Sequence, residues 1–215
     1  MVVAGVSSAH GQNVLGEILR RMDMNNKSLQ SLRAKVTMVK FNSQLNIPDT
    51  TIGNTSYLAK TSSRGRYILI DWLQPLEEHV SVIGDDYELW RPRLNQVLVG
   101  KVDKAKNSAS MGGALSFMSM SKEQLKENFT VIYVGEEQVK GGGNTWHLQL
   151  TPKTAANYKM AEIWVDGNGM PVQAKTVENN GDTTTVLLEN IVKNETLKGD
   201  IFKLKYPSSV KKVRP

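Results

Sequence analysis

Apolar residues recur along the chain with two different periods, and the change of period separates a helical start from a strand-rich remainder. Val14, Ile18 and Met22 repeat every four residues, with charged residues on the opposite side, which predicts an amphipathic helix over residues 14–24. After residue 31 the period becomes two, and apolar positions alternate with polar ones over residues 32–39. The chain therefore opens with one helix and continues as β-strands.

Short alternating segments of this kind predict about eleven strands. They lie at residues 32–39, 56–60, 66–72, 78–83, 87–90, 96–99, 129–134, 146–150, 161–165, 172–177 and 184–191, with a last short strand near 202–205. Glycine-rich segments at 141–144 and 166–169 separate strand pairs and predict hairpin turns. Many antiparallel strands without long crossovers favour a barrel or a strongly curved sheet over a parallel α/β fold.

A methionine-rich segment interrupts the strands between residues 104 and 128. Ser121 is a good N-cap with Gln124 at the capping-box position, which predicts a short helix there. Methionine side chains are apolar, unbranched and able to repack around different shapes. We therefore predict a movable lid over a cavity, or alternatively the core of a fixed helix, from Met111, Leu115, Phe117, Met118 and Met120.

The candidate walls of such a cavity are the apolar faces of those strands whose other face is polar. Alternation identifies a face, but that face either lines an open space or packs against a filled core. The candidate acyl-chain-binding residues chosen on this basis are Val36, Met38, Ile68, Ile70, Trp72, Val80, Val82, Trp146 and Leu148.

Composition narrows the chemistry that the chain can perform. It has 215 residues, no Cys, and a net charge of +6, so thiolate chemistry and cysteine-held metals are excluded and an anionic partner is permitted. His10, His79 and His147 lie far apart, form no metal-binding pair, and are expected to be solvated residues. We expect no enzyme, cofactor or metal, although a hydrolase with a dispersed triad stays open. Lys and Arg are spread along the chain, which disfavours nucleic-acid binding.

The first residues are small and weakly apolar, unlike the charged helix that follows. Ala9 and Gly11 stand at the −3 and −1 positions of a signal-peptidase site before Gln12. We predict that residues 1–11 are the remnant of a secretory signal and that residues 12–215 form one domain, with an unstructured N-terminus as the alternative. Export would place the protein outside the cytoplasm.

A series of ordered motifs resembles one family, the LolA-type periplasmic lipoprotein carriers of Gram-negative bacteria. The motifs are DWLQP (71–75), GDDYELWRP (84–92), NQV (95–97), WHLQLTPK (146–153) and IWVDGNG (163–169), followed by Asn194, Leu197, Phe202 and Pro207. The resemblance covers roughly residues 13–213. It implies a mainly β fold with an α lid: an incomplete antiparallel β-barrel of about eleven strands, with two or three helices covering its cavity.

The resemblance also implies a function and its partners. A carrier of this kind shields lipoprotein acyl chains in an apolar cavity during transfer across the periplasm, from an inner-membrane lipoprotein-releasing transporter to an outer-membrane receptor, and is expected to be a monomer. The family's lid-latching arginine lies in a Lys-Arg-Pro-Asn-like turn, which is replaced here by residues 59–66. Arg64 or Arg66 takes its place, or no latch exists. A carrier of another lipid or acylated ligand, and a receptor or stress-sensing domain of the same fold, are the alternatives.

Overall fold

The fold is built mainly from long β-strands. A computed structural model describes residues 7–63, 65–102, 120–141 and 143–214. Its helices are α1 (Ser7–Ser28) and α3 (Lys122–Asn128), with short 3-10 turns η1 (Pro92–Leu94) and η2 (Gly199–Phe202). The strands are β1 (Ser31–Asn42), β2 (Ile47–Leu58), β3 (Tyr67–Gln74), β4 (Glu78–Ile83), β5 (Asp86–Arg91), β6 (Gln96–Lys101), β7 (Phe129–Gln138), β8 (Asn144–Pro152), β9 (Tyr158–Asp166), β10 (Pro171–Glu178), β11 (Thr183–Lys193) and β12 (Lys211–Val213).

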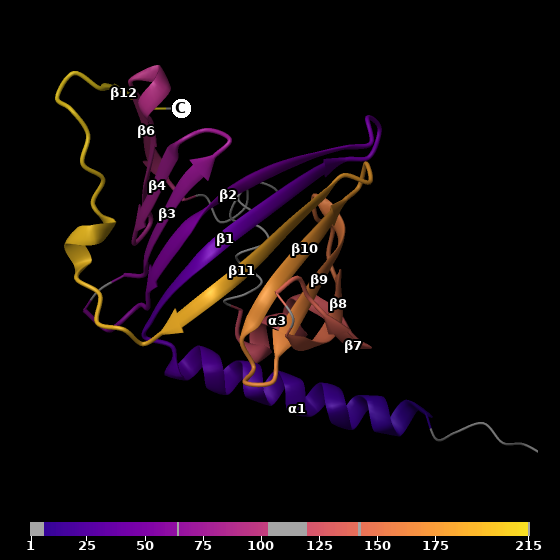
Figure 1. Cartoon of the computed structure of the whole chain (residues 1–215). Coiled ribbons are helices and arrows are strands. Elements are labelled where there is room, and N and C mark those ends of the chain that lie inside the picture. The colour runs from indigo at the N-terminus through magenta and orange to yellow at the C-terminus, as the bar shows by residue number, and fades with distance from the viewer. Residues whose placement is uncertain (1–6, 64, 103–119, 142, 215) are drawn as a thin grey trace, which may run out of the picture. The chain divides into compact units, whose positions relative to one another are not determined.

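These strands form a single 12-stranded sheet that does not close on itself. Its hydrogen-bonded order is β12-β6-β5-β4-β3-β2-β1-β11-β10-β9-β8-β7 (Figure 1). The hairpins β3–β4, β4–β5, β7–β8 and β9–β10 are antiparallel, whereas β12 pairs with β6 in parallel. The predicted mainly β fold with an incomplete barrel is therefore confirmed, with twelve strands where about eleven were predicted.

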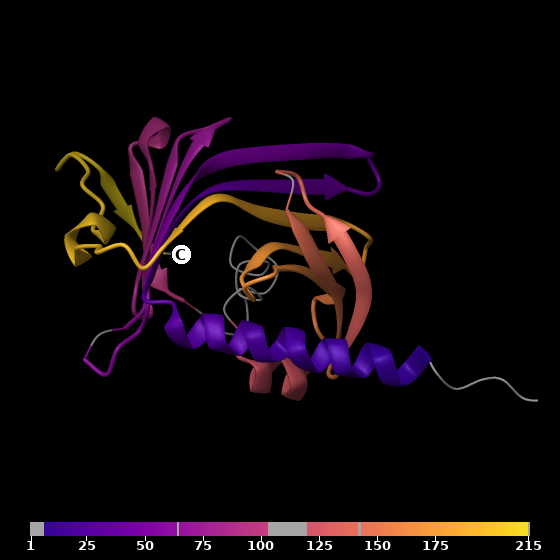
Figure 2. The ribbon, with the colours of Figure 1, turned by 60° about the horizontal axis from the view of Figure 1, so that its bottom comes forward.

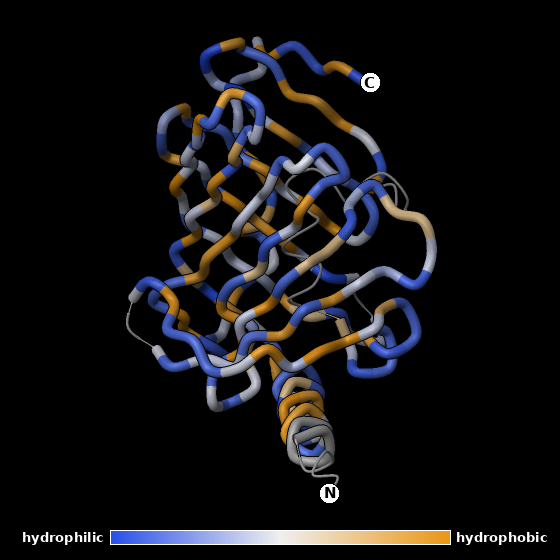
Figure 3. The backbone as a smooth tube through the Cα atoms, turned by 90° about the vertical axis from the view of Figure 1, so that its right-hand side faces the viewer, coloured by the Kyte–Doolittle hydropathy of each residue, from blue (hydrophilic) through white to orange (hydrophobic). Residues whose placement is uncertain are grey.

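The chain divides into two compact units. The first contains residues 1–28, 41–47 and 108–186, and the second contains 29–40, 48–107 and 187–215. Each has its own fully buried apolar side chains, such as Ile163 in the first and Phe202 in the second. Along the strands of both units apolar and polar residues alternate, as the orange and blue segments of Figure 3 show.

In the first unit, helix α1 packs on the turn that joins β9 to β10 (Figure 1). Ile18, Leu19 and Met22 are at most 3% exposed, as the four-residue period predicted. The helix begins earlier than predicted, at Ser7, so it runs into the segment interpreted as a leader remnant. Helix α3 lies beside α1 (Figure 2). The predicted capping box of Ser121 is confirmed, because its hydroxyl accepts from the Gln124 N–H while the Gln124 side chain accepts from the Ser121 N–H.

In the second unit, the C-terminal segment packs on one face of β3 and β4. Phe202 is fully buried, and its ring meets that of Tyr67 edge-on at 5.5 Å between centroids. The Ser81 hydroxyl donates to the Phe202 carbonyl. The strand predicted near residues 202–205 is therefore wrong: η2 turns Phe202 into the core, and the last strand forms later, at β12.

Candidate functional site

Five of the candidate acyl-binding residues form one continuous face in the second unit. In the β3–β4 hairpin Ile68 pairs with Val82 and Ile70 with Val80, while Trp72 lies one pair further along. Directly opposed residues of antiparallel strands point to the same side of a sheet. The face extends over β5 because Val80 also pairs with Leu89. The structure thus brings these residues together as the alternation predicted.

The face is apolar, but its residues differ in exposure. Ile70, Trp72 and Val80 are 4%, 2% and 8% exposed, whereas Ile68 and Val82 are half-buried. Val36 and Met38, on β1 of the same unit, are also buried. Ile68 and Val82 are consequently the more accessible part of this face.

Tyr57, a half-buried residue of β2, extends the same face. Tyr57 pairs with Ile68 across β2 and β3. Burial raises the pKa of the Tyr57 phenol, and the positive charge of Arg66 partly opposes that rise. Desolvation of this kind disfavours the charged form of an acid.

The remaining two candidates lie on an equivalent face of the first unit. Trp146 pairs with Val165, and Leu148 pairs with Ile163 on β9 and Tyr133 on β7. Leu148 is fully buried, and Trp146 is half-buried beneath the Arg21 guanidinium, 5.3 Å from its ring centroid. Burial is the main cause that raises the pKa of Tyr133. Each unit therefore has one apolar face of the predicted kind.

Most of the predicted lid lies outside the described residues: Met111, Leu115, Phe117 and Met118. Met120 is described and is half-buried just before α3. Of the two latch candidates, Arg64 also lies outside the described residues, and Arg66 is exposed immediately before β3. The movable lid and the latch stay predictions.

The expectation that the strand histidines are solvated is wrong. The side chains of His79 and His147 are 16% and 12% exposed. His79 stacks on Trp90, its cross-strand partner, at 4.9 Å, and His147 stacks on Trp164 at 4.4 Å. Sequence alternation places each histidine on the side of its strand opposite the apolar face. It could not predict which tryptophan of the neighbouring strand would stack on it, because that depends on strand pairing.

Carboxylates complete both histidine clusters. The two ring nitrogens of His79 lie 2.7 Å from Asp71 and 3.0 Å from Glu77, and those of His147 lie 3.1 Å from Glu137 and 3.2 Å from Glu162. These carboxylates lie on neighbouring strands or turns, so no short sequence motif could predict their contacts with the histidines. Nowhere in the described ranges do three or more His, Asp or Glu side chains gather in a manner suited to a metal ion.

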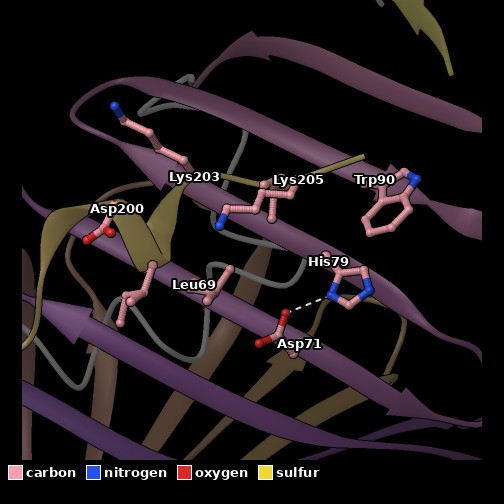
Figure 4. Close-up of a pocket in the computed structure, with 9 residues that line it drawn as sticks. Leu69, Asp71, His79, Trp90, Asp200, Lys203 and Lys205 are labelled. Carbon is pink, nitrogen blue, oxygen red and sulfur yellow. Dashed lines mark hydrogen bonds and ion pairs between the residues drawn. The ribbon is translucent and has the colours of Figure 1, made fainter. Parts of the chain in front are cut away.

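A pocket lies on the polar face of β3, β4 and β5, opposite the candidate acyl-binding face and beneath residues 200–205. It has a volume of about 370 Å³. Its residues are Leu69, Asp71, His79, Trp90, Asp200, Ile201, Lys203, Leu204 and Lys205, as Figure 4 shows. None of the nine predicted acyl-binding residues lines it, so it is a site that the sequence did not reveal.

A family model described as "Outer membrane lipoprotein carrier protein LolA" matches residues 63–205, which is more than half of the chain. The chain belongs to the LolA family. The matched segment contains η2 and every strand from β3 to β11, so this LolA-family chain carries most of the sheet within the region that defines the family. No curated protein matches it.

Solved structures share the fold of this LolA-family protein at low sequence identity. An uncharacterized conserved protein from Thermus thermophilus is 12% identical with a TM-score of 0.59, over 94% of this chain and 99% of the other. A DUF1329 family protein from Desulfovibrio piger is 16% identical with a TM-score of 0.51, over 90% and 97%. The Pseudomonas aeruginosa MucA/MucB complex contains a chain 14% identical with a TM-score of 0.53, over 88% and 60%. These likenesses support the fold.

Among the helices in the described residues, none combines the length and the apolar character needed to cross a bilayer.

Proposed function

We propose that this protein is a periplasmic carrier that shields lipoprotein acyl chains in an apolar cavity during transfer from the inner to the outer membrane. The observation that carries the proposal is the continuous apolar face of β3 and β4 in a chain of the LolA family. Its cargo would come from an inner-membrane lipoprotein-releasing transporter and leave to an outer-membrane receptor.

The energetics of an acyl chain define what such a carrier must do. Exposure to water costs about 0.8 kcal/mol per CH₂, so a chain of ~16 carbons carries on the order of 10 kcal/mol of unfavourable exposure. The apolar face of β3 and β4 that contains Ile68 and Val82 supplies side chains that replace water around the chain. Release requires that the enclosure open, which is the role proposed for the methionine-rich lid and for an arginine latch at Arg64 or Arg66.

A second candidate function is binding of another lipid or acylated ligand, or a receptor or stress-sensing role. Two observations favour it. Residues 59–66 lack the family's usual latch turn, and the fold is shared with MucB, which was solved in complex with MucA. A receptor or sensor would bind a protein partner stably, whereas a carrier exchanges its lipid cargo between two partners.

The test is lipid content combined with a matched pair of variants. Native mass spectrometry of protein purified without detergent should show bound acylated molecules. Val82→Asn places an amide on the candidate face, and Val99→Asn places the same amide on the opposite face, where Val99 pairs with Glu88. An unpaired amide against hydrocarbon costs about 1–3 kcal/mol, so Val82→Asn should weaken binding of a fluorescent fatty acid about tenfold or more.

Val99→Asn should leave that affinity within about twofold of the parent protein. Both residues are half-buried, which makes folding costs comparable. Equal affinities in the two variants, or a native protein that carries no acylated molecule, would reject the proposed carrier. Stable capture of a protein partner by lipid-free protein would favour the second candidate instead.

A further inference from the structure

The pocket beneath residues 200–205 is formed because the C-terminal segment is fixed at both ends and bridges the sheet between them. At one end Phe202 is fully buried and its carbonyl accepts from Ser81. At the other, Val210 is buried and β12 pairs with β6. Between these anchors the backbone crosses the polar face of β3, β4 and β5 without joining the sheet as a strand. Space therefore stays open between the segment and the sheet.

This space contains two pockets that share Lys203 and Leu204. The first pocket, described above, has a volume of about 370 Å³, and the second, lined also by Ser81, Ile83, Asp86, Glu88 and Tyr206, has about 410 Å³. Ligand sites in proteins are typically ~300–1,000 Å³ and mostly apolar with a few placed polar groups. Both pockets fall within that size range.

The two pockets differ in charge. The second contains the carboxylates of Asp86, which pairs with Lys101, and Glu88, which accepts from the Tyr206 hydroxyl at 3.2 Å. The first contains two lysines, Lys203 and Lys205, and within the described residues neither amine has a carboxylate within 4 Å. Asp71 and Asp200 also line the first pocket, and Lys203 lines both, so lysines and carboxylates are equal in number in the first pocket while carboxylates outnumber lysines in the second. An anionic group is therefore less disfavoured in the first pocket than in the second.

Two carboxylates, Asp71 and Asp200, line the first pocket, and Asp200 lies at one end of it in Figure 4. Asp71 is engaged by His79, whose other ring nitrogen lies 3.0 Å from Glu77. In Figure 4 the Lys205 side chain extends over the pocket between Asp200 at one end and His79 and Trp90 at the other. Lys205 is therefore the cation best placed to meet a ligand's negative group.

The rest of the first pocket is apolar. Leu69 comes from β3, the Trp90 indole from β5, and Ile201 and Leu204 from the C-terminal segment. Ile201 is 36% exposed although its neighbour Phe202 is fully buried, so an apolar group on this side of the segment meets water in the free protein. Covering it with a ligand's apolar part is favourable at about 25 cal/mol per Å².

We propose that this first pocket is a second binding site, separate from the acyl-binding face, for a small ligand that combines one apolar group with one carboxylate. The apolar group lies against Leu69, Trp90 and Leu204, and the carboxylate pairs with Lys205. Two sources supply this chemistry, a free fatty acid and the carboxyl end of a peptide with an apolar last residue. The inference does not depend on the carrier function, because it uses the opposite face of β3, β4 and β5.

The four tryptophans provide separate reporters for the two faces. Trp72 and Trp146 lie on the candidate acyl-binding faces, Trp90 lines the pocket, and Trp164 stacks on His147. Their indole N–H signals in a ¹⁵N-labelled protein, assigned with single Trp→Phe variants, would be followed during titration with octanoate, octanol, octylammonium and N-acetyl-leucine. The first three probes each contain eight carbons, and their head groups are negative, neutral and positive.

Octanoate should shift the Trp90 signal with an affinity about two- to fivefold above that of octanol or octylammonium. Lys205→Gln should remove that preference, because one charge-assisted contact of this exposure is worth up to about 1 kcal/mol. Lys198→Gln is the matched control: Lys198 is exposed on the same segment but does not line the pocket, and its variant should bind like the parent. Stronger shifts with N-acetyl-leucine than with octanoate would identify a peptide end as the source, and weaker ones a fatty acid.

Three results would overturn the inference: no shift of the Trp90 signal, an equal response to octanol and octanoate, or an unchanged response in Lys205→Gln. The outcome is independent of the carrier proposal. Shifts of Trp72 or Trp146 without Trp90 would support acyl binding and reject the second site. A charge-dependent shift of Trp90 alone would support the second site, and the carrier proposal would still be judged by its own lipid-content and Val82 tests.

Discussion

Packing of helix α1 against the β9–β10 turn of the first unit depends on a single glycine in that turn. Gly169 has φ +84°, and a methyl group added there would overlap the carbonyl carbon and oxygen of Arg21 and lie 2.7 Å from the Met22 nitrogen. These are backbone atoms of the helix, which cannot rotate away as a flexible side chain would. The turn and the helix also share a hydrogen bond of 2.8 Å from the Arg21 guanidinium to the Gly167 carbonyl.

Gly169→Ala should therefore destabilise the protein through two effects. The left-handed backbone conformation costs a non-glycine residue about 1–2 kcal/mol, and forced overpacking against the helix adds about 1–3 kcal/mol. The sum of about 2–5 kcal/mol corresponds to a fall in Tm of roughly 4–20 °C for a chain of this size, at about 2–4 °C per kcal/mol. The helix must also move, so buried Ile18 and Leu19 should gain exposure.

Gly84→Ala is the matched control for the backbone term. Gly84 has φ +65°, but a methyl group there would have no heavy atom within 4 Å. Its Tm should fall by only about 2–8 °C, from about 1–2 kcal/mol of conformational cost. Thermal denaturation followed by circular dichroism gives both Tm values, and hydrogen exchange reports the protection of amides 18–22. Equal losses in the two variants, with α1 protection unchanged, would refute the steric argument.

Three further changes test separate parts of the structure. Hydrogen bonds from Arg20 and Arg21 lower the pKa of Glu17 from its ordinary value of 4.5 to about 2. Because the folded pKa is the lower one, the stabilisation of the fold by ionised Glu17 is present above about pH 4.5 and is lost as the pH falls toward 2. Glu17→Gln should therefore lower the Tm at pH 7 and leave it unchanged at pH 2. Thermal melts over a series of pH values check this. Phe202→Ala removes a fully buried ring and should cost about 3–5 kcal/mol in urea unfolding, with faster proteolysis after residue 202; unchanged proteolysis would contradict the anchoring role of Phe202. Ser121→Ala deletes the α3 cap and should cost about 1 kcal/mol by the same unfolding assay, whereas Ser121→Thr, which keeps the hydroxyl, should cost less.

Local sequence patterns predicted the structure correctly where the interactions that stabilise it join residues only a few positions apart. The Ser121 capping box joins residues three apart, and it formed as predicted. The period of two over β3 and β4 placed Ile68, Ile70 and Val80 on one face, because side chains of a strand alternate by geometry. The strand prediction was wrong near residue 202. A short apolar segment there was interpreted as a strand, but Phe202 lies in a 3-10 turn with its ring buried.

Taken by itself, the sequence determined the secondary-structure class, the apolar face of strands such as β3 and β4, and the family, since these depend on residue period and on ordered motifs. Only the tertiary structure decided which residues from distant strands meet. His79 on β4 contacts Asp71 on β3 and Trp90 on β5. β12 pairs in parallel with β6, although more than a hundred residues of chain separate the two strands. The pocket beneath residues 200–205 exists for the same reason: its two walls are far apart in sequence, and no periodicity specifies what a long, non-local connection will cover.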